Sequence, residues 1–252
     1  MSNINPVLSV ITVVYNNVQG IERTMLSVLN QTYPNIEYII IDGKSDDGTV
    51  EVIEKYRDRL AQFVSQKDKG IYYAMSKGLT LMTGDYVLFM NSGDEIYAPD
   101  TVARIFATAH WADIYYGETE MINAQGESLG RRRHKAPAKF NWRSFSWGMS
   151  VSHQAIYIKY GLIGPFDKKF KLSADIDWII RAAKKAYKIV NTHMYVAKYE
   201  VGGISKKKHI RSLFERFLIM CSYYGVIPTL LRHLVMPFRL IGYYAVNRRT
   251  ND

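Results

Sequence analysis

Cysteine is nearly absent from this sequence of 252 residues, and its C-terminal part lacks an apolar run long enough to cross a membrane. The single cysteine, Cys221, excludes a framework of disulfides and fits a reducing compartment. The uncharged stretch 217–231 is shorter than the roughly 20 apolar residues that a spanning helix needs, and it contains Gly225 and Pro228. The first residues lack the basic segment of a secretory signal, so we expect a cytoplasmic protein.

Internal repeats, low-complexity tracts and glycine-rich phosphate loops are also missing. The last absence argues against a nucleotidyltransferase with such a loop after its first strand. The composition is that of an ordinary globular protein, with 48% hydrophobic and 22% charged residues. A chain of this length can bury one large core or two modest ones.

Positive charge is concentrated at the C-terminal end. Residues from 205 onward include nine Lys or Arg against two carboxylates, which accounts for +7 of the formal net charge of +10. Such a segment implies an anionic partner, either lipid headgroups or nucleic acid. The apolar residues between these cations suit helices that lie in the headgroup plane. The alternative is an amphipathic helix pair packed on the rest of the protein.

Strands and helices alternate through the first hundred residues. Apolar runs predict strands at 8–15, 36–41, 62–65 and 87–90, and helical spacing predicts helices at 21–29, 50–60 and 71–82. This alternation implies right-handed crossovers and a mainly parallel sheet flanked by helices, an α/β fold. Beyond residue 100 the pattern is looser, with strands expected at 113–117 and 154–159 and a helix that opens at 173–177.

Carboxylates follow three of these strands, at Asp42, Asp68 and Asp94. Because the carboxyl ends of parallel strands meet at one edge, we expect the three to line a single crevice, where open α/β sheets bind ligands. Asp94 is the candidate metal ligand, since Mg²⁺ on a diphosphate needs only one or two protein carboxylates. A single such aspartate could equally be a turn residue that accepts backbone hydrogen bonds, but three in successive units favour a site. A nucleic-acid-binding role would not explain them.

Seven segments, in this order, resemble family 2 glycosyltransferases of the GT-A fold, and above all the bacterial enzymes that build O-antigen, capsule or exopolysaccharide units. They are SVITVVYN at 9–16, DGKSDDGT at 42–49, DKGIYYAMSKG at 68–78, TGDYVLFMNSGD at 83–94, HQAI at 153–156, ADIDW at 174–178 and GGIS at 202–205. The resemblance implies a Rossmann-like catalytic domain over 1–204, with a nucleotide-sugar half at 1–118 and an acceptor half at 119–204. A basic amphipathic helical tail at 205–252 would follow.

The resemblance also implies a nucleotide-sugar donor, usually linked to UDP. Asp42 matches the family aspartate that contacts the nucleoside, and Asp68 matches the one that binds the edge of the base. The backbone around Thr12, Val14 and Tyr15 would line the nucleotide pocket.

Asp94 matches the last aspartate of the metal-binding Asp-x-Asp element, so Mn²⁺ or Mg²⁺ is the expected cofactor. The sequence departs from that element, because it has one carboxylate where two are common. Asp175 matches the catalytic base, which must take a proton from the acceptor hydroxyl as that hydroxyl attacks the anomeric carbon. The alternatives are that Asp175 caps the following helix and that Asp177 is the base.

Four more residues are candidates for contact with the diphosphate or the acceptor: His153, Trp178, Lys206 and His209. His153 could instead be a structural residue, and Trp178 could belong to the core.

The sequence thus predicts an inverting, metal-dependent transfer of a hexose or N-acetylhexosamine. The acceptor would be a glycan on a polyprenyl diphosphate, at the inner face of the cytoplasmic membrane. The rival hypothesis is a catalytically inactive sugar-nucleotide-binding or membrane scaffold protein.

Overall fold

The computed structural model describes residues 5–132, 134–148, 151–202 and 209–235. The strands are β1 Leu8–Val14, β2 Ile36–Asp42, β3 Gln62–Ser65, β4 Tyr86–Phe89, β5 Glu95–Ile96, β6 Ile114–Ile122, β7 Ser128–Arg131, β8 Ile156–Lys159 and β9 Ile189–Glu200. The α-helices are α1 Val18–Leu29, α2 Thr49–Glu54, α3 Ile71–Leu81, α4 Thr101–Thr108, α5 Ala174–Lys185 and α7 His209–Tyr224. Short 3₁₀ helices are η1 Arg57–Arg59, η2 Trp142–Trp147, η3 His153–Ala155 and η4 Tyr160–Leu162.

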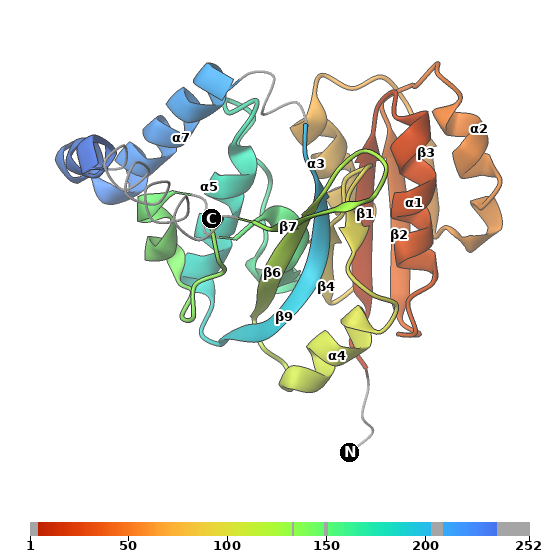
Figure 1. The fold of residues 1–252 in the computed structure, drawn as a ribbon, viewed down its shortest axis with the longest axis horizontal. Coiled ribbons are helices and arrows are strands. Elements are labelled where there is room, and N and C mark those ends of the chain that lie inside the picture. Colours follow the sequence, from red (N-terminus) through yellow and green to blue (C-terminus); the bar gives the residue numbers. More distant parts are fainter. Residues whose placement is uncertain (1–4, 133, 149–150, 203–208, 236–252) are drawn as a thin grey trace, which may run out of the picture.

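The described strands form one mixed sheet in the order β3-β2-β1-β4-β8-β6-β9-β5, with β7 paired to β6. The first four strands in that order are parallel, as the alternating sequence pattern predicts. Strand β8 runs antiparallel to both β4 and β6, and β9 runs parallel to β6. Helices α1 and α2 lie on one side of the sheet, and α3, α5 and α7 lie on the other (Figure 1). This is a mixed α/β fold.

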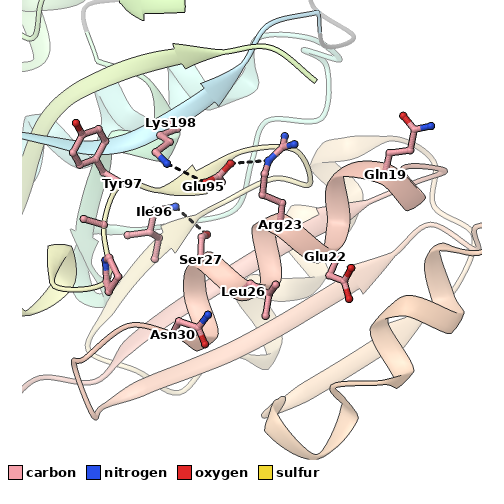
Figure 2. A pocket seen from close by; sticks show the side chains of 12 residues that line it. Gln19, Glu22, Arg23, Leu26, Ser27, Asn30, Glu95, Ile96, Tyr97 and Lys198 are labelled. Carbon is pink, nitrogen blue, oxygen red and sulfur yellow. Dashed lines mark hydrogen bonds and ion pairs between the residues drawn. The ribbon is translucent and has the colours of Figure 1, made fainter. Parts of the chain in front are cut away.

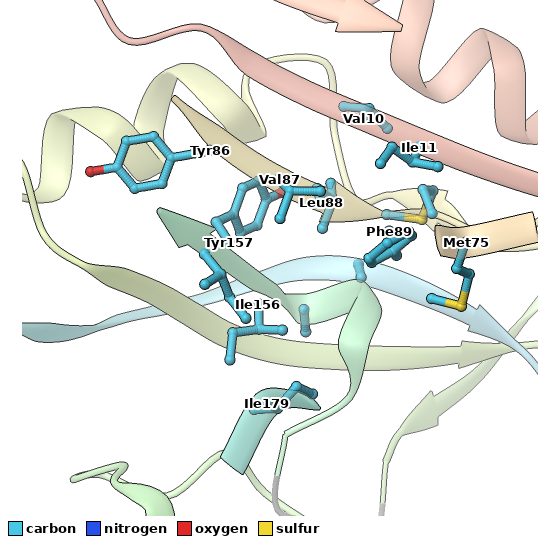
Figure 3. Packing of buried hydrophobic residues seen from close by; sticks show 14 of the residues in the cluster. Val10, Ile11, Met75, Tyr86, Val87, Leu88, Phe89, Ile156, Tyr157 and Ile179 are labelled. Atoms are coloured by element: carbon cyan, nitrogen blue, oxygen red, sulfur yellow. The ribbon is translucent and has the colours of Figure 1, made fainter. Parts of the chain in front are cut away.

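The core lies where β1, β4 and β8 meet α3 and α5. All seven residues of β1 and all four of β4 are buried, which fits their largely apolar sequences, in which Ser9 and Thr12 of β1 are the polar residues. Figure 3 shows Ile11 of β1 and Phe89 of β4 close to Met75 of α3, with Ile179 of α5 nearby. Helix α3 approaches β1 so closely that a Cβ at Gly78 would lie 2.4 Å from Ile11 Cγ2.

The predicted boundaries hold best in the parallel half. The helix expected at 50–60 is shorter, because α2 ends at Glu54 and η1 follows it. Strand β6 extends beyond the expected 113–117, and β8 starts two residues later than expected because η3 precedes it. Strands β5, β7 and β9 and helix α4 have no counterpart among the predictions. The three strands alternate only weakly, and α4 is amphipathic but only eight residues long.

Helix α7 packs on the rest of the protein with one face. Ile219 and Met220 are buried, and Glu215 accepts a hydrogen bond from Leu172 N at 2.7 Å. Its other face leaves Ile210 and Phe214 86% and 60% exposed. A second helix covers 226–235. Within the described part of the chain, no helix has both the length and the apolar content to cross a membrane.

Candidate functional site

The loops that follow β1, β2 and β4 meet at one edge of the sheet. Asn17, after β1, donates its side-chain N–H to Ser92 Oγ in the turn after β4 (2.9 Å). The backbone N–H of Asn17 donates to Thr49 Oγ1 at the start of α2 (3.1 Å). Asn16 N donates to Ser45 Oγ in the turn after β2 (2.8 Å). These loops therefore meet at the edge where the sequence predicted a crevice lined by Asp42, Asp68 and Asp94.

Asp94 ends the turn after β4, and its N–H donates to Asn91 O at 3.0 Å. Gly93 has a φ of +101°, and a Cβ there would lie 2.8 Å from Glu200 Oε2, so this position requires glycine. Asp94 itself is 4% exposed. One carboxylate oxygen accepts from Gln154 Nε2 at 2.6 Å and the other from Glu200 N at 2.9 Å. Burial outweighs these hydrogen bonds and raises the pKa of Asp94 to about 6.

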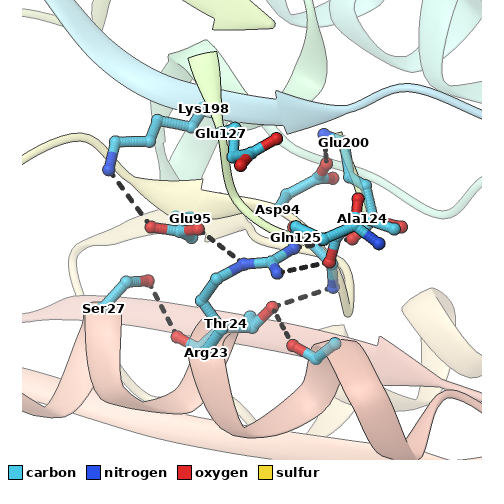
Figure 4. A network of polar contacts seen from close by, with 12 residues as sticks. Arg23, Thr24, Ser27, Asp94, Glu95, Ala124, Gln125, Glu127, Lys198 and Glu200 are labelled. Atoms are coloured by element: carbon cyan, nitrogen blue, oxygen red, sulfur yellow. Dashed lines mark hydrogen bonds and ion pairs between the residues drawn. The ribbon is translucent and has the colours of Figure 1, made fainter. Parts of the chain in front are cut away.

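A salt-bridge network anchors the strand that supports Asp94. Figure 4 shows Arg23 of α1 beneath Glu95 and Glu200. Its guanidinium lies 2.6 Å from Glu95 Oε1 and 2.7 Å from Glu200 Oε2. Glu200, whose backbone N–H donates to Asp94, is thus held by its own side chain to Arg23 of α1.

His153 connects Asp175 to the Asp94 turn. His153 Nδ1 lies 3.0 Å from Asp175 Oδ2, and His153 Nε2 lies 2.9 Å from Asn91 Nδ2. Since an amide nitrogen donates, Nε2 accepts and Nδ1–H donates to the carboxylate. Tyr72 OH of α3 donates to the other oxygen of Asp175 at 2.9 Å. Asp175 therefore faces the polar edge rather than the backbone of its own helix, and the N-cap position belongs to Ser173.

The surroundings of Asp175 favour its ionised form. Burial alone would raise its pKa, but hydrogen bonds from His153 and Tyr72 and the charge of Arg216 hold the pKa below its usual value. Asp177 is engaged elsewhere, because it accepts from Tyr223 OH at 2.7 Å and from Arg181 Nε at 2.9 Å. Of the two aspartates, Asp175 is the one that shares hydrogen bonds with the strand-end loops.

The residues expected to bind the nucleotide differ in how far their side chains are exposed and free of hydrogen bonds. Asp42 is fully buried and accepts hydrogen bonds from Lys44 N, Ser45 N, Ser45 Oγ and Ser65 Oγ, so here it closes its own turn. Thr12 is also buried, and its hydroxyl donates to Met90 O at 2.7 Å. Val14 is 6% exposed. The side chains of Thr12 and Val14 are therefore core, and their backbone is already paired in the sheet.

Asp68 and Tyr15 lie at the same edge, where Tyr15 is largely exposed and the Asp68 side chain is only 11% exposed. Asp68 Oδ1 lies 3.0 Å from Lys77 Nζ, whereas its buried Oδ2 has no hydrogen-bond partner within the described residues. Tyr15 is 66% exposed, and its ring lies against the turn after β2, where a Cβ on Gly43 would be 3.2 Å away. An acceptor without a described partner and an exposed aromatic ring, both at this edge of the sheet, suit the N–H edge and the face of a nucleobase.

The oxygen atoms at the Asp94 turn fit a hard divalent cation in part. Asp94 supplies one carboxylate, and Asn91 Oδ1 is buried without a hydrogen-bond partner among the described residues. Those residues contain no group of three His, Cys, Asp or Glu side chains that could enclose a metal. The set matches a site that leaves most ligand positions to phosphate oxygens and water.

Of the remaining expected contacts, the structure contradicts that of Trp178 and does not describe the side chains of Lys206 and His209. Trp178 is 2% exposed, stacks on Phe166 at 5.2 Å and donates to Gly164 O, so it is a core residue and the prediction of an acceptor contact was wrong. The alternative prediction, that Trp178 belongs to the core, is the correct one. Lys206 lies outside the described residues, and of His209 only the backbone, at the start of α7, is described.

A hollow with a volume of about 470 Å³ lies beside this cluster, between α1 and β5 (Figure 2). Its cations Arg23 and Lys198 both pair with Glu95. Neither Asp94 nor Asp175 lines it. Its charges are thus already matched within the protein.

Sequence reasoning missed the residues that connect the site. Tyr72, Asn91 and Gln154 lie inside segments that carried the family resemblance, but nothing in their spacing shows which aspartate they contact. Glu200 and Arg23 had no signal, because they approach Asp94 through strand β9 and helix α1, far away in sequence.

The family model described as glycosyl transferase family 2 matches residues 9–163. An uncharacterized glycosyltransferase of Mycobacterium tuberculosis (strain CDC 1551 / Oshkosh) is 30% identical over 218 residues, which cover 83% of this chain and 80% of that protein. A PGL/p-HBAD biosynthesis glycosyltransferase of Mycobacterium bovis is 29% identical over 211 residues, 79% of each chain.

Solved structures agree in fold. Residues 1–349 of S. aureus TarS in complex with UDP match with a TM-score of 0.66 at 21% identity, covering 86% of this chain and 64% of that one, which is less than two thirds of its length. The mannosyltransferase PcManGT from Pyrobaculum calidifontis, in complex with GDP-Man and Mn²⁺, matches with a TM-score of 0.67 at 18% identity, covering 96% and 74%. These matches confirm the GT-A fold. Because the family model spans more than half of the sequence, the chain belongs to glycosyl transferase family 2.

Proposed function

We propose that this glycosyltransferase moves a hexose or N-acetylhexosamine from a UDP-sugar to a hydroxyl of a polyprenyl-diphosphate-linked glycan, with inversion, during synthesis of a bacterial surface polysaccharide. One observation carries the proposal. Consecutive residues His153 and Gln154 bind Asp175 and Asp94, so the expected base and the expected metal ligand belong to one hydrogen-bonded cluster. A donor diphosphate at Asp94 would then lie beside an acceptor hydroxyl at Asp175.

The chemistry follows from this juxtaposition. The acceptor oxygen forms a bond to the anomeric carbon while the bond from that carbon to the diphosphate oxygen breaks, and the hydroxyl proton passes to Asp175. Because the pKa of Asp175 is held low, the carboxylate is ionised at neutral pH and can accept the proton. Attack opposite the leaving group inverts the configuration at the anomeric carbon.

Asp94 and Asn91 would hold Mn²⁺ or Mg²⁺. A cation bound there would neutralise charge that develops on the departing diphosphate. The complex of PcManGT with GDP-Man and Mn²⁺ supports a metal in this fold.

The nucleotide would lie across the ends of β1 and β3. Asp68 Oδ2 would accept from the N–H edge of the base, and Tyr15 would cover its face. TarS structures that contain UDP and UDP-GlcNAc support a uridine donor. Asp42 would contribute by keeping the turn after β2 in place.

The acceptor half, 119–204, and the tail, 205–252, would place the protein on the inner face of the cytoplasmic membrane. The exposed apolar residues of α7 and of the helix at 226–235 support this location. Arg211, more than half of whose side chain is exposed, would contact anionic headgroups.

A donor panel tests the proposal. Purified protein with Mn²⁺ or Mg²⁺, a panel of nucleotide sugars and a lipid-linked acceptor should release a nucleoside diphosphate from one donor. EDTA and Asp94→Ala should abolish the release. Donor binding without turnover would support the inactive sugar-nucleotide-binding scaffold instead, and no nucleotide binding would overturn both hypotheses.

A further inference from the structure

A second pocket, of about 320 Å³, lies where η2 meets α7 and the helix that follows it. It is lined by Trp142, Arg143, Ser146, Tyr223, Tyr224, Pro228 and Arg232. We call it the Trp142 pocket. All of its lining residues come from the second half of the chain, so it is separate from the crevice proposed for the nucleotide.

Stacked aromatic rings and cations form its walls. The rings of Trp142 and Tyr224 are stacked at 5.7 Å with an angle of 10°, and Tyr224 OH donates to Trp142 O. Arg143 and Lys184 lie 5.1 and 5.2 Å from the centre of the Trp142 ring. Arg232 lies 5.9 Å from that of Tyr224. The aromatic stack thus lies beside three cations, of which Arg143 and Arg232 line the pocket.

These cations have no carboxylate partners. Within the described residues, Arg143, Lys184 and Arg232 form no ion pair, although the chain pairs other cations readily. Arg232 Nη1 is moreover buried without a hydrogen-bond acceptor in the part of the chain that the structure describes. A buried guanidinium N–H without an acceptor is costly, and an anionic oxygen supplies what it lacks.

The pocket lies beside helix α5, which carries the proposed base. Tyr223, in its wall, donates to Asp177, two residues after Asp175 on α5. Lys184 lies nine residues after Asp175 on the same helix, about 13 Å along its axis. Because nine residues make about two and a half turns of a helix, Lys184 lies on the opposite side of α5 from Asp175. An acceptor that reaches both Asp175 and the pocket must therefore pass around this helix.

An apolar surface continues from the pocket. The helix at 226–235 that supplies Arg232 also exposes Ile227, Leu231 and Leu234, at 72%, 59% and 67%. Free phosphate or a nucleotide would make no use of this surface, whereas a hydrocarbon chain attached to a diphosphate would cover it.

We propose that the Trp142 pocket binds the diphosphate of a lipid-linked acceptor, with Arg143 and Arg232 as the ligands of its oxygens. The inference rests on the proposed function for the identity of the acceptor. It adds the site that selects a diphosphate-bearing lipid over a free glycan.

Calorimetry with farnesyl diphosphate tests this site, with UDP present in excess to occupy the donor crevice. The wild-type chain should bind, and Arg143→Gln combined with Arg232→Gln should weaken binding at least tenfold, or about 1.4 kcal/mol. Arg232→Lys keeps the charge but loses the planar fork, so it should give an intermediate affinity. Arg57→Gln removes an exposed arginine from η1 and should leave the affinity unchanged.

Two further ligands identify the source of the binding energy. Inorganic pyrophosphate should compete with farnesyl diphosphate, and farnesol should not bind measurably. Equal affinity for farnesol, or unchanged affinity in the double variant, would overturn the pocket assignment. The double variant could also lose binding to phosphatidylglycerol vesicles and keep its affinity for farnesyl diphosphate. That result would show that the two arginines contact only the membrane, and it would overturn the assignment. Absence of UDP binding would instead count against the proposed function. In that case the same titrations of wild type and variants with farnesyl diphosphate, without UDP, would still show whether the pocket binds the diphosphate.

Discussion

His153 Nδ1 lies 3.0 Å from Asp175 Oδ2, while the next residue, Gln154, donates to Asp94 Oδ2 at 2.6 Å. The 3₁₀ turn η3 therefore joins the proposed base to the proposed metal ligand through two adjacent side chains. Any shift of this turn would change the position of one carboxylate relative to the other. The geometry makes His153 a positioning residue for Asp175.

His153→Ala should lower kcat by roughly 10- to 100-fold, because it removes a charge-assisted hydrogen bond from the base. The KM for the donor should stay within about twofold, since His153 would not touch the nucleotide. The conservative His153→Asn retains an N–H donor and should recover part of the activity. Steady-state kinetics of the wild type and the two variants measure both constants. A rise in the donor KM as large as the fall in kcat would contradict a role in positioning Asp175.

The pH dependence of the same variant gives an independent readout. Hydrogen bonds from His153 and Tyr72 hold the pKa of Asp175 below its usual value, so activity in the wild type should fall only at acid pH, where the carboxylate is protonated. Without His153 the pKa rises, and the acid limb of the kcat/KM profile should move to higher pH. An unmoved limb would show that His153 has only a structural role.

Asp94→Asn should stabilise the metal-free protein at neutral pH. Burial raises the pKa of Asp94 from 3.8 to about 6 in the folded state. Below about pH 4 the group is protonated in both states, and as pH rises through 6 the folded state must hold a buried charge, so stability is lost. At neutral pH the variant should exceed the wild type by up to about 3 kcal/mol, and the gain should vanish near pH 4.

Thermal unfolding in the presence of EDTA, at both pH values, measures this effect. An equal gain at both pH values would contradict the buried-charge explanation. Gln154 must turn its amide so that its oxygen accepts from the N–H of the introduced side-chain amide, and Gln154→Ala in the variant background should therefore reduce the gain.

Asp68→Asn should weaken UDP binding by about 1–3 kcal/mol, because the N–H edge of the base would lose its charged acceptor. Asp58→Asn, a change at an exposed aspartate of η1, is the matched control and should bind UDP as the wild type does. Calorimetric titration with UDP compares the two. Equal affinities would remove Asp68 from the nucleotide site.

Phe214→Ser should reduce binding to anionic vesicles by roughly 30-fold, because a fully buried phenylalanine contributes about 2 kcal/mol. Trp111→Ser removes an exposed aromatic residue elsewhere and serves as the control. Deleting the tail is a poor test, because Ile219 and Met220 of α7 are buried in the domain. Co-sedimentation that is unchanged in Phe214→Ser would argue against membrane attachment through this face.

The sequence predicted the parallel half of the fold because its signals are local. Strands β1, β2 and β4 are apolar on both faces, and the turns after β2 and β4 contain glycine beside their aspartates. Strand β9 escaped prediction since its exposure is irregular along its length. Its pairing with β6 also includes register shifts, which leave no simple alternation.

For the site, the sequence identified the carboxylates but could not identify their partners. Asp42, Asp94 and Asp175 were equivalent as strand-end or helix-start residues. Only the structure shows that Asp42 is enclosed by its own turn, whereas Tyr72 contacts Asp175 across 103 residues of sequence. Contacts of that separation depend on the crossing of α3 and α5, which no local pattern encodes.

The central claim is that Asp175 is the base in a donor site organised around Asp94. The most direct test is turnover of Asp175→Asn beside its affinity for UDP, with the donor found in the panel. The account predicts that kcat falls by about 10²- to 10⁴-fold while UDP binds as tightly as it does to the wild type. Turnover within about twofold of the wild type would contradict the account, since the acceptor proton would then leave by another route.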